Sequence, residues 1–124
     1  MIILVVDDEQ DVKLLFEQRF RKEIRKEELH FVFAFSGEEA LKIMESMDQE
    51  AVLILSDINM PGMSGLELLK TIRKTYVKPR PVVMMITAYG DEENRNTSLK
   101  LGADNFLTKP LDFNILKTKL KEIT

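Results

Sequence analysis

The sequence predicts an α/β fold in which five parallel β-strands alternate with α-helices, and three observations support this. Short continuous apolar runs alternate along the chain with segments whose apolar residues recur every three or four positions. The apolar runs are rich in valine, isoleucine and phenylalanine, which is typical of strands that are covered on both faces. The helical segments lie between consecutive runs, and such crossover connections require a mostly parallel sheet.

The elements follow one another in a regular β-α order. The expected strands are Ile2–Val6, Phe31–Phe35, Ala51–Leu55, Val82–Ile86 and Phe106–Leu107. Apolar stripes of helical spacing are formed by Val12, Leu15, Phe16 and Phe20, by Ala40, Leu41, Met44 and Met47, by Leu66, Leu69 and Ile72, and by Phe113, Leu116, Leu120 and Ile123. We therefore expect a flavodoxin-like, doubly wound (βα)5 sandwich whose five-stranded parallel sheet has the order 2-1-3-4-5.

Local signals mark the ends of the helices and one loop. The sequence SGEE at Ser36–Glu39 matches a capping box, and Gly102 suits the position just after a helix within residues 90–102. That helix has no apolar stripe, since Leu99 and Leu101 are its only large apolar residues. The loop after the third strand contains residues that stop a strand or allow tight backbone turns, namely Pro61, Gly62 and Gly65.

Length and composition favour a single domain over residues 1–124. The chain is 44% hydrophobic and 31% charged, as is usual for globular proteins, and it contains no cysteine. Its first apolar run ends after Val6, too early for a signal-peptide core or a membrane span, so a cytoplasmic protein without a membrane partner is expected. The net charge of −3 and the lack of a basic stripe argue against direct nucleic-acid binding.

Polar side chains follow several of the expected strands. In an open α/β sheet, ligands bind beyond the carboxyl ends of the strands where the strand order reverses. Asp7 and Asp8 follow the first strand and Asp57 follows the third, and these strands are neighbours in the expected order. We therefore expect the three carboxylates to converge, with Thr87 and Lys109 on the far side of the site.

These residue types suit phosphoryl transfer. Three crowded carboxylates repel one another and attract a cation, and oxygen ligands with room for water suit Mg²⁺, with Mn²⁺ as an alternative. A metal ion and Lys109 on either side of Asp57 would neutralise an incoming phosphoryl group, and the hydroxyl of Thr87 could donate to one of its oxygens. The carboxylate of Asp57 is then the candidate nucleophile, which would form an aspartyl phosphate.

Four motifs carry a resemblance to a known family. In their order and spacing, VVDDE, SDINMPGMSG, ITAYG and LTKP resemble the receiver domain of two-component response regulators, the CheY-like family. The resemblance extends from Ile3 to about Ile123. It implies a phosphoacceptor switch that takes a phosphoryl group on Asp57 from the phosphohistidine of a histidine kinase or phosphotransfer protein. Such a domain is not an enzyme beyond its own phosphorylation and slow autodephosphorylation.

The resemblance also implies roles for individual residues. Asp8 and Asp57 would ligate Mg²⁺ together with the backbone carbonyl of Asn59, with Asp7 helping directly or through water. Thr87, Lys109 and the aromatic Phe106 would form the switch. The sequence departs from the family where Phe106 replaces a frequent tyrosine, and where Ser98 and Leu101 replace common alanines.

Two structural consequences are expected near the end of the chain. The Lys109–Pro110 peptide bond should be cis, because the chain must direct a lysine toward Asp57 while turning into the last helix, and cis bonds are accessible before proline. The helix within residues 90–102, the fifth strand and the last helix should form the face that binds an effector or a second copy, because that helix is weakly anchored and follows Thr87 directly.

Other functions remain open at this point. A phosphatase of the haloacid dehalogenase type would also use an aspartate nucleophile, but it needs a second aspartate two residues later, where this chain has Asn59. A flavin carrier would need a phosphate-binding loop after the first strand, where DDEQD would repel phosphate. A degenerate receiver that serves only for docking would be expected to lack part of the residue set.

Overall fold

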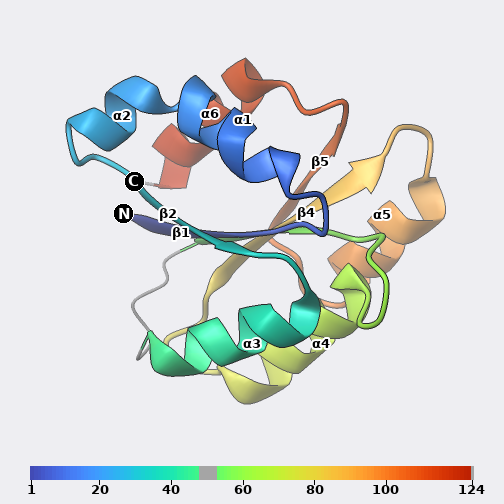
Figure 1. Ribbon diagram of the computed structural model, residues 1–124. Coiled ribbons are helices and arrows are strands. Elements are labelled where there is room, and N and C mark those ends of the chain that lie inside the picture. Colours follow the sequence, from blue (N-terminus) through green and yellow to red (C-terminus); the bar gives the residue numbers. More distant parts are fainter. Residues whose placement is uncertain (48–52, 124) are drawn as a thin grey trace.

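The residues described by the computed structural model, 1–47 and 53–123, form a single sheet with helices on both faces (Figure 1). They contain five strands: β1 (Ile2–Val6), β2 (His30–Ala34), β3 (Leu53–Asp57), β4 (Val82–Ala88) and β5 (Asn105–Lys109). All neighbouring strands pair in parallel, in the order β2-β1-β3-β4-β5. The predicted doubly wound fold and its strand order are confirmed.

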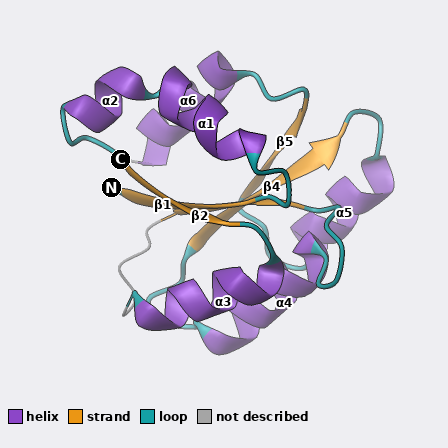
Figure 2. Ribbon diagram, viewed as in Figure 1, coloured by secondary structure: helices purple, strands orange, loops and turns teal. Residues whose placement is uncertain are grey.

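The helices divide between the two faces of the sheet (Figure 2). One face is covered by α1 (Asp11–Arg19), α2 (Arg21–Arg25) and α6 (Phe113–Ile123), and the other by α3 (Gly37–Ser46), α4 (Gly65–Thr75) and α5 (Glu92–Lys100). In the described part of the chain, no helix combines the length and the apolar character needed to cross a membrane.

Alternate residues of the central strands enter two separate cores. Ile3 of β1 packs in the cluster that contains Phe16 and Leu116, while Leu4, its neighbour in sequence, packs in the cluster of Leu68. Because side chains of a strand point alternately to opposite faces, a strand covered on both sides must be apolar at every position. This explains why the central strands are continuous apolar runs.

The structure corrects some predicted boundaries. The first predicted helix is divided at Phe20 into α1 and α2, and Leu15, expected on its buried stripe, is 40% exposed because Phe16 and Phe20 occupy the inner face. Strand β2 begins and ends one residue earlier than predicted, since His30 pairs with Ile2 at the start of β1. Strand β5 (Asn105–Lys109) extends beyond the predicted strand Phe106–Leu107 at both ends. Ala51 and Val52, the start of the third predicted strand, lie outside the described residues.

Two predicted helix ends are confirmed. The hydroxyl of Ser36 accepts a hydrogen bond from the backbone N–H of Glu39 at 3.0 Å, which caps the N-terminus of α3. Gly102 follows α5 with φ of 100°, and the N–H groups of Gly102 and Ala103 donate to the carbonyls of Leu99 and Ser98. This is the Schellman arrangement, in which the left-handed residue is usually glycine.

Charged side chains tie the turn after α5 to the rest of the domain. Arg73, in the last turn of α4, donates to the carbonyl oxygens of Gly102 (2.8 Å) and Pro81 (2.6 Å) and to the carboxylate of Asp104 (2.8 Å). Arg80 donates to Asp104 (2.7 Å) and to Gly102 (3.0 Å), and the N–H of Val83 donates to Asp104 (2.8 Å). We call Arg73, Arg80, Gly102 and Asp104 the Asp104 junction.

The junction shifts the pKa of its carboxylate. Partial burial alone would raise the pKa of Asp104, but the hydrogen bonds from Arg80 and Val83 and the charges of Arg73 and Arg80 together hold it below its ordinary value. The ionised form of Asp104 is therefore the form that stabilises the fold.

Replacing Asp104 with asparagine tests this through its pH dependence. Because the pKa of Asp104 is lower in the folded state, its stabilising effect is present above the unfolded-state pKa and is lost as the pH falls through the folded-state pKa. We expect Asp104→Asn to lower the free energy of unfolding by about 1 kcal/mol near neutral pH, a modest effect because the carboxylate is partly exposed. Urea unfolding should show this difference shrinking below about pH 4.

The exposed Glu122, which contributes to no contact of the junction, provides the matched control Glu122→Gln. At every pH, the free energy of unfolding of this variant should stay close to that of the wild type. A cost of Asp104→Asn that is the same at low and neutral pH would contradict the assigned role of the charge.

Candidate functional site

Three carboxylates meet at the carboxyl edge of the sheet. Asp7 and Asp8 follow β1, Asp57 is the last residue of β3, and β1 and β3 are neighbours. Each of these residues offers a carboxylate oxygen, and the three oxygens lie within 4.8 Å of one another. Asp57 is only 3% exposed and Asp7 is also buried, whereas Asp8 is open to solvent. The cluster therefore has a buried base and an open mouth.

Backbone groups orient two of the carboxylates. The N–H of Glu9 donates to Asp7 at 2.9 Å, and the N–H of Asn59 donates to Asp57 at 3.3 Å. Both bonds reach a residue two positions later, a turn that aspartate commonly forms. They hold each side chain close to its own loop, with one oxygen of Asp57 left for other partners.

The start of α4 lies directly against Asp57. A Cβ atom at Gly65 would overlap the carbonyl oxygen of Asp57, so only glycine allows this close approach. A backbone turn, the predicted reason for a glycine at position 65, is therefore wrong. The same reason is correct for Gly62, whose φ of 74° lies in the left-handed region that favours glycine.

Burial raises the pKa of Asp7 above its ordinary value, and the negative charge of Asp57 adds to this effect. The hydrogen bond from Glu9 and the positive charge of Lys109 act in the opposite direction but do not cancel it. Negative charge is thus held at this edge at an energetic cost, which a bound cation would relieve.

Lys109 supplies the positive charge of the site. Its Nζ donates to Asp57 at 2.8 Å and joins the last residue of β5 to the last residue of β3. Burial alone would lower the pKa of Lys109, but the hydrogen bond and the charge of Asp57 raise it above its ordinary value. The Lys109–Pro110 peptide bond is cis, as is the Lys78–Pro79 bond.

Thr87 and Phe106 lie on adjacent strands beside this pair. The hydroxyl of the buried Thr87 donates to the carbonyl of Leu107 at 3.4 Å, a long bond. Phe106 is partly buried, and the guanidinium carbon of Arg95 lies 5.0 Å from the centre of its ring. Arg95 could not be identified from the sequence, because nothing in α5 distinguishes it from neighbouring charged residues and its partner lies eleven positions later.

The arrangement is chemically specific. Three carboxylates offer oxygen ligands of the kind that a hard divalent cation prefers. A carboxylate oxygen with a lysine ammonium at hydrogen-bonding distance, and a buried hydroxyl on the intervening strand β4, can receive an anionic group. The structure thus brings together Asp7, Asp8, Asp57 and Lys109, and it places Thr87 and Phe106 on the adjoining strands.

Comparison with known proteins finds a matching family profile and curated relatives. The profile of the response regulator receiver domain matches residues 3–121. The transcriptional regulatory protein CpxR of Escherichia coli K12 is 34% identical over 121 residues, which are 98% of this chain and 48% of CpxR. The chain therefore spans about half the length of the curated relatives that it matches.

Solved structures agree in fold. The receiver domain of the Francisella response regulator 1452 matches with a TM-score of 0.83 and 28% identity, over 98% of this chain and 94% of that one. The receiver domain of Saccharomyces cerevisiae Ssk1, crystallised with the histidine phosphotransfer protein Ypd1, matches with a TM-score of 0.85 over 98% of this chain and 87% of that one. Its identity is 23%, and this likeness shows the fold alone.

A double-mutant cycle tests the coupling between Lys109 and Asp57. Removing the ammonium by Lys109→Met leaves a nearly buried carboxylate beside two others, and we expect the metal-free protein to lose about 2 kcal/mol of stability. In an Asp57→Asn background the same change should cost at least about 1 kcal/mol less. Chemical unfolding in the presence of a chelator measures both values.

Lys42→Met, at an exposed lysine of α3, controls for the general effect of this substitution. Its cost should be small and the same in both backgrounds. Equal costs of Lys109→Met with and without the Asp57 charge would show that the ion pair does not hold the site together.

Proposed function

The chain belongs to the response regulator receiver domains of two-component systems, and from this premise we propose that it is a phosphoacceptor switch whose phosphorylated residue is Asp57. The observation that carries the proposal is the contact of the nearly buried carboxylate of Asp57 with Lys109, beside Asp7 and Asp8. The comparisons give no support to the alternative of a phosphatase of the haloacid dehalogenase type.

The residues of the site fit Mg²⁺. Asp8, Asp57 and the backbone carbonyl of Asn59 would ligate the ion, with Asp7 contributing directly or through water, and Mn²⁺ would suit the same oxygens. The raised pKa of Asp7 supports the assignment, because it shows that the metal-free cluster holds its negative charge unfavourably. When bound, the ion would supply positive charge that helps Lys109 to neutralise the phosphoryl oxygens.

In the proposed transfer, Asp57 is the nucleophile and a phosphohistidine is the donor. A carboxylate oxygen of Asp57 attacks the phosphorus of a phosphohistidine, a P–O bond forms and the P–N bond breaks. The electron pair of that bond returns to the imidazole nitrogen of the donor, and the ring leaves as neutral imidazole because its other nitrogen carries a proton. Lys109 exchanges its bond to Asp57 for one to a phosphoryl oxygen, and the Thr87 hydroxyl leaves the carbonyl of Leu107 to donate to another.

A phosphodonor protein requires a docking surface beside the carboxylates. On α1, which follows Asp8 after a short turn, Leu14 is 61% exposed and Leu15 is 40% exposed. They line a shallow hollow of about 310 Å³ together with Glu9, Asp11, Val12 and Gln18. We assign this surface to a histidine kinase or phosphotransfer protein, because an apolar contact here would place a phosphohistidine near Asp57.

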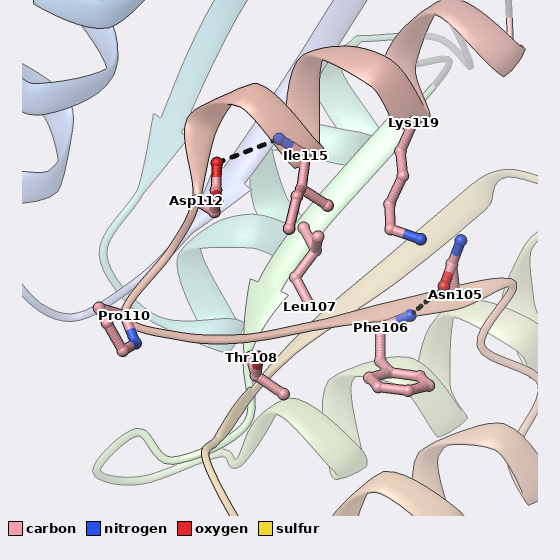
Figure 3. A pocket seen from close by; sticks show the side chains of 8 residues that line it. All are labelled: Asn105, Phe106, Leu107, Thr108, Pro110, Asp112, Ile115 and Lys119. Carbon is pink, nitrogen blue, oxygen red and sulfur yellow. Dashed lines mark hydrogen bonds between the residues drawn. The ribbon is translucent and has the colours of Figure 1, made fainter.

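The output surface is the face formed by α5, β5 and α6. A hollow of about 240 Å³ lies on it, and Figure 3 shows Ile115 and Lys119 extending from α6 toward β5. Phe106 is also among the residues that line this hollow, and Figure 3 shows its ring on the side of β5 away from Ile115 and Lys119. We assign this face to an effector or to a second copy of the chain.

Mass measurement of the intact protein tests the phosphoacceptor directly. With acetyl phosphate and Mg²⁺, the wild type should gain the mass of one phosphoryl group, and Asp57→Asn should gain none. A chelator should abolish the gain, because the site then lacks the charge that balances the phosphoryl oxygens. The control Asp112→Asn, in the N-terminal turn before α6, should be labelled like the wild type. Equal labelling of Asp57→Asn and the wild type would refute the assignment.

The carboxylate cluster makes a second prediction about the metal. In the metal-free protein, Asp8→Asn removes one repelling charge and should raise the melting temperature by about 2–4 °C. The same change removes a ligand and should weaken Mg²⁺ binding by about tenfold or more. Thermal unfolding over a Mg²⁺ titration measures both effects. Asp11→Asn, outside the cluster, is the control, and unchanged Mg²⁺ affinity in Asp8→Asn would exclude Asp8 as a ligand.

A further inference from the structure

The two ends of α5 are held very differently. At its C-terminal end, the carbonyl oxygen of Gly102 accepts hydrogen bonds from both Arg73 and Arg80, and Asp104 accepts from both arginines and from the backbone of Val83. The N–H of Asp104 in turn donates to the carbonyl of Val83 at 2.8 Å. The turn between α5 and β5 is therefore bound to α4 and to the start of β4.

The N-terminal end has no comparable attachment among the described residues. Tyr89 is 86% exposed, and apart from Gly90 and its two neighbours in sequence no described residue lies within 4 Å of the position that a Cβ of Gly90 would occupy. Asp91 caps the helix by accepting from the backbone and the side chain of Asn94, so its side-chain bonds stay within the helix, and its backbone N–H donates to the carbonyl of Ala88 at 3.1 Å. Glu92 and Glu93 are exposed.

The middle of α5 has few contacts that could prevent movement. Within α5, all of which is described, Ser98 is the one buried residue, and its hydroxyl donates to the carbonyl of Arg95 in its own helix. Leu99 is 43% exposed. The contact of Arg95 with the ring of Phe106 links this part of the helix to β5, and such a contact is weak where solvent reaches it.

We propose that α5 is hinged at the Asp104 junction, so that its N-terminal end, the end next to Thr87, moves while its C-terminal end stays in place. The inference deepens the proposed function, on which its role in signalling rests. A displacement of Thr87 reaches α5 through four residues, Ala88 to Asp91, at the end that has fewer attachments.

The hinge has a consequence for β5. Asn105, the first residue of β5, follows the junction directly and pairs with Met84 of β4. Because Asp104 is bound to Val83, the start of β5 keeps its register when α5 swings. The movement would instead carry Arg95 across Phe106, so the ring loses or gains its cation without any displacement of the strand.

Amide hydrogen exchange in the free protein tests the hinge without any phosphodonor. We compare the amide of Arg95, bonded to Asp91, with those of Leu101 and Ala103, bonded to Thr97 and Ser98. The wild type should exchange about tenfold faster at Arg95, because local opening is easier where a helix is not anchored. Arg73→Gln should remove most of this difference, and Lys74→Gln, at the exposed neighbouring lysine, should preserve it.

Arg80→Gln provides a second variant in case Arg73→Gln lowers overall stability, since Arg80 is much more exposed than Arg73. It should reduce the same difference to a smaller extent. Equal exchange at the two ends of α5 in the wild type would overturn the hinge. Retention of the full difference in both arginine variants would also overturn it.

Addition of Mg²⁺ and beryllofluoride separates the hinge from the proposed function. We expect exchange to change in residues 88–96 and to stay within roughly twofold of its free value in residues 99–104. A larger change in residues 99–104 than in residues 88–96 would overturn the hinge. The absence of any change around Asp57 would count against the proposed function, and the free-protein comparison would still decide whether the hinge exists.

Discussion

The ion pair between Asp57 and Lys109 is the interaction on which the arrangement of this domain depends. It joins the ends of β3 and β5 across β4, and its carboxylate is almost completely removed from solvent. A buried carboxylate without a cation is strongly unfavourable, so the pair requires a strand order that brings these two ends together. The same order places Asp7 and Asp8, at the end of β1, on the other side of Asp57.

The domain combines a rigid frame with a weakly anchored helix. The two apolar cores hold β1, β3 and β4 from both faces, and Gly65 allows the start of α4 to lie directly against Asp57. Helix α5 contributes little to either core. In the proposed switch, a change of charge at Asp57 can therefore alter α5 with small losses of packing, while the strands of the frame stay in place.

Much of the fold and the carboxylate cluster could be predicted from the sequence because both depend on regular patterns. Continuous apolar runs identify strands that are buried on both faces, and residues that follow such runs share one edge of a parallel sheet. The Asp104 junction and the contact of Arg95 with Phe106 could not be predicted, because each joins ordinary charged residues far apart in sequence. Leu15 shows a further limit, since helical spacing alone does not decide which edge of an apolar stripe is buried.

A crystal structure with Mg²⁺ and beryllofluoride would show whether the charges around Asp57 are arranged to receive a phosphoryl group. We expect beryllium to be bonded to a carboxylate oxygen of Asp57, and a metal ion to lie about 2.0–2.1 Å from oxygens of Asp8, Asp57 and the Asn59 carbonyl. Lys109 and Thr87 should each contact a fluoride. Beryllofluoride bound elsewhere, or bound at Asp57 without Lys109 and without a metal ion in the carboxylate cluster, would contradict the account.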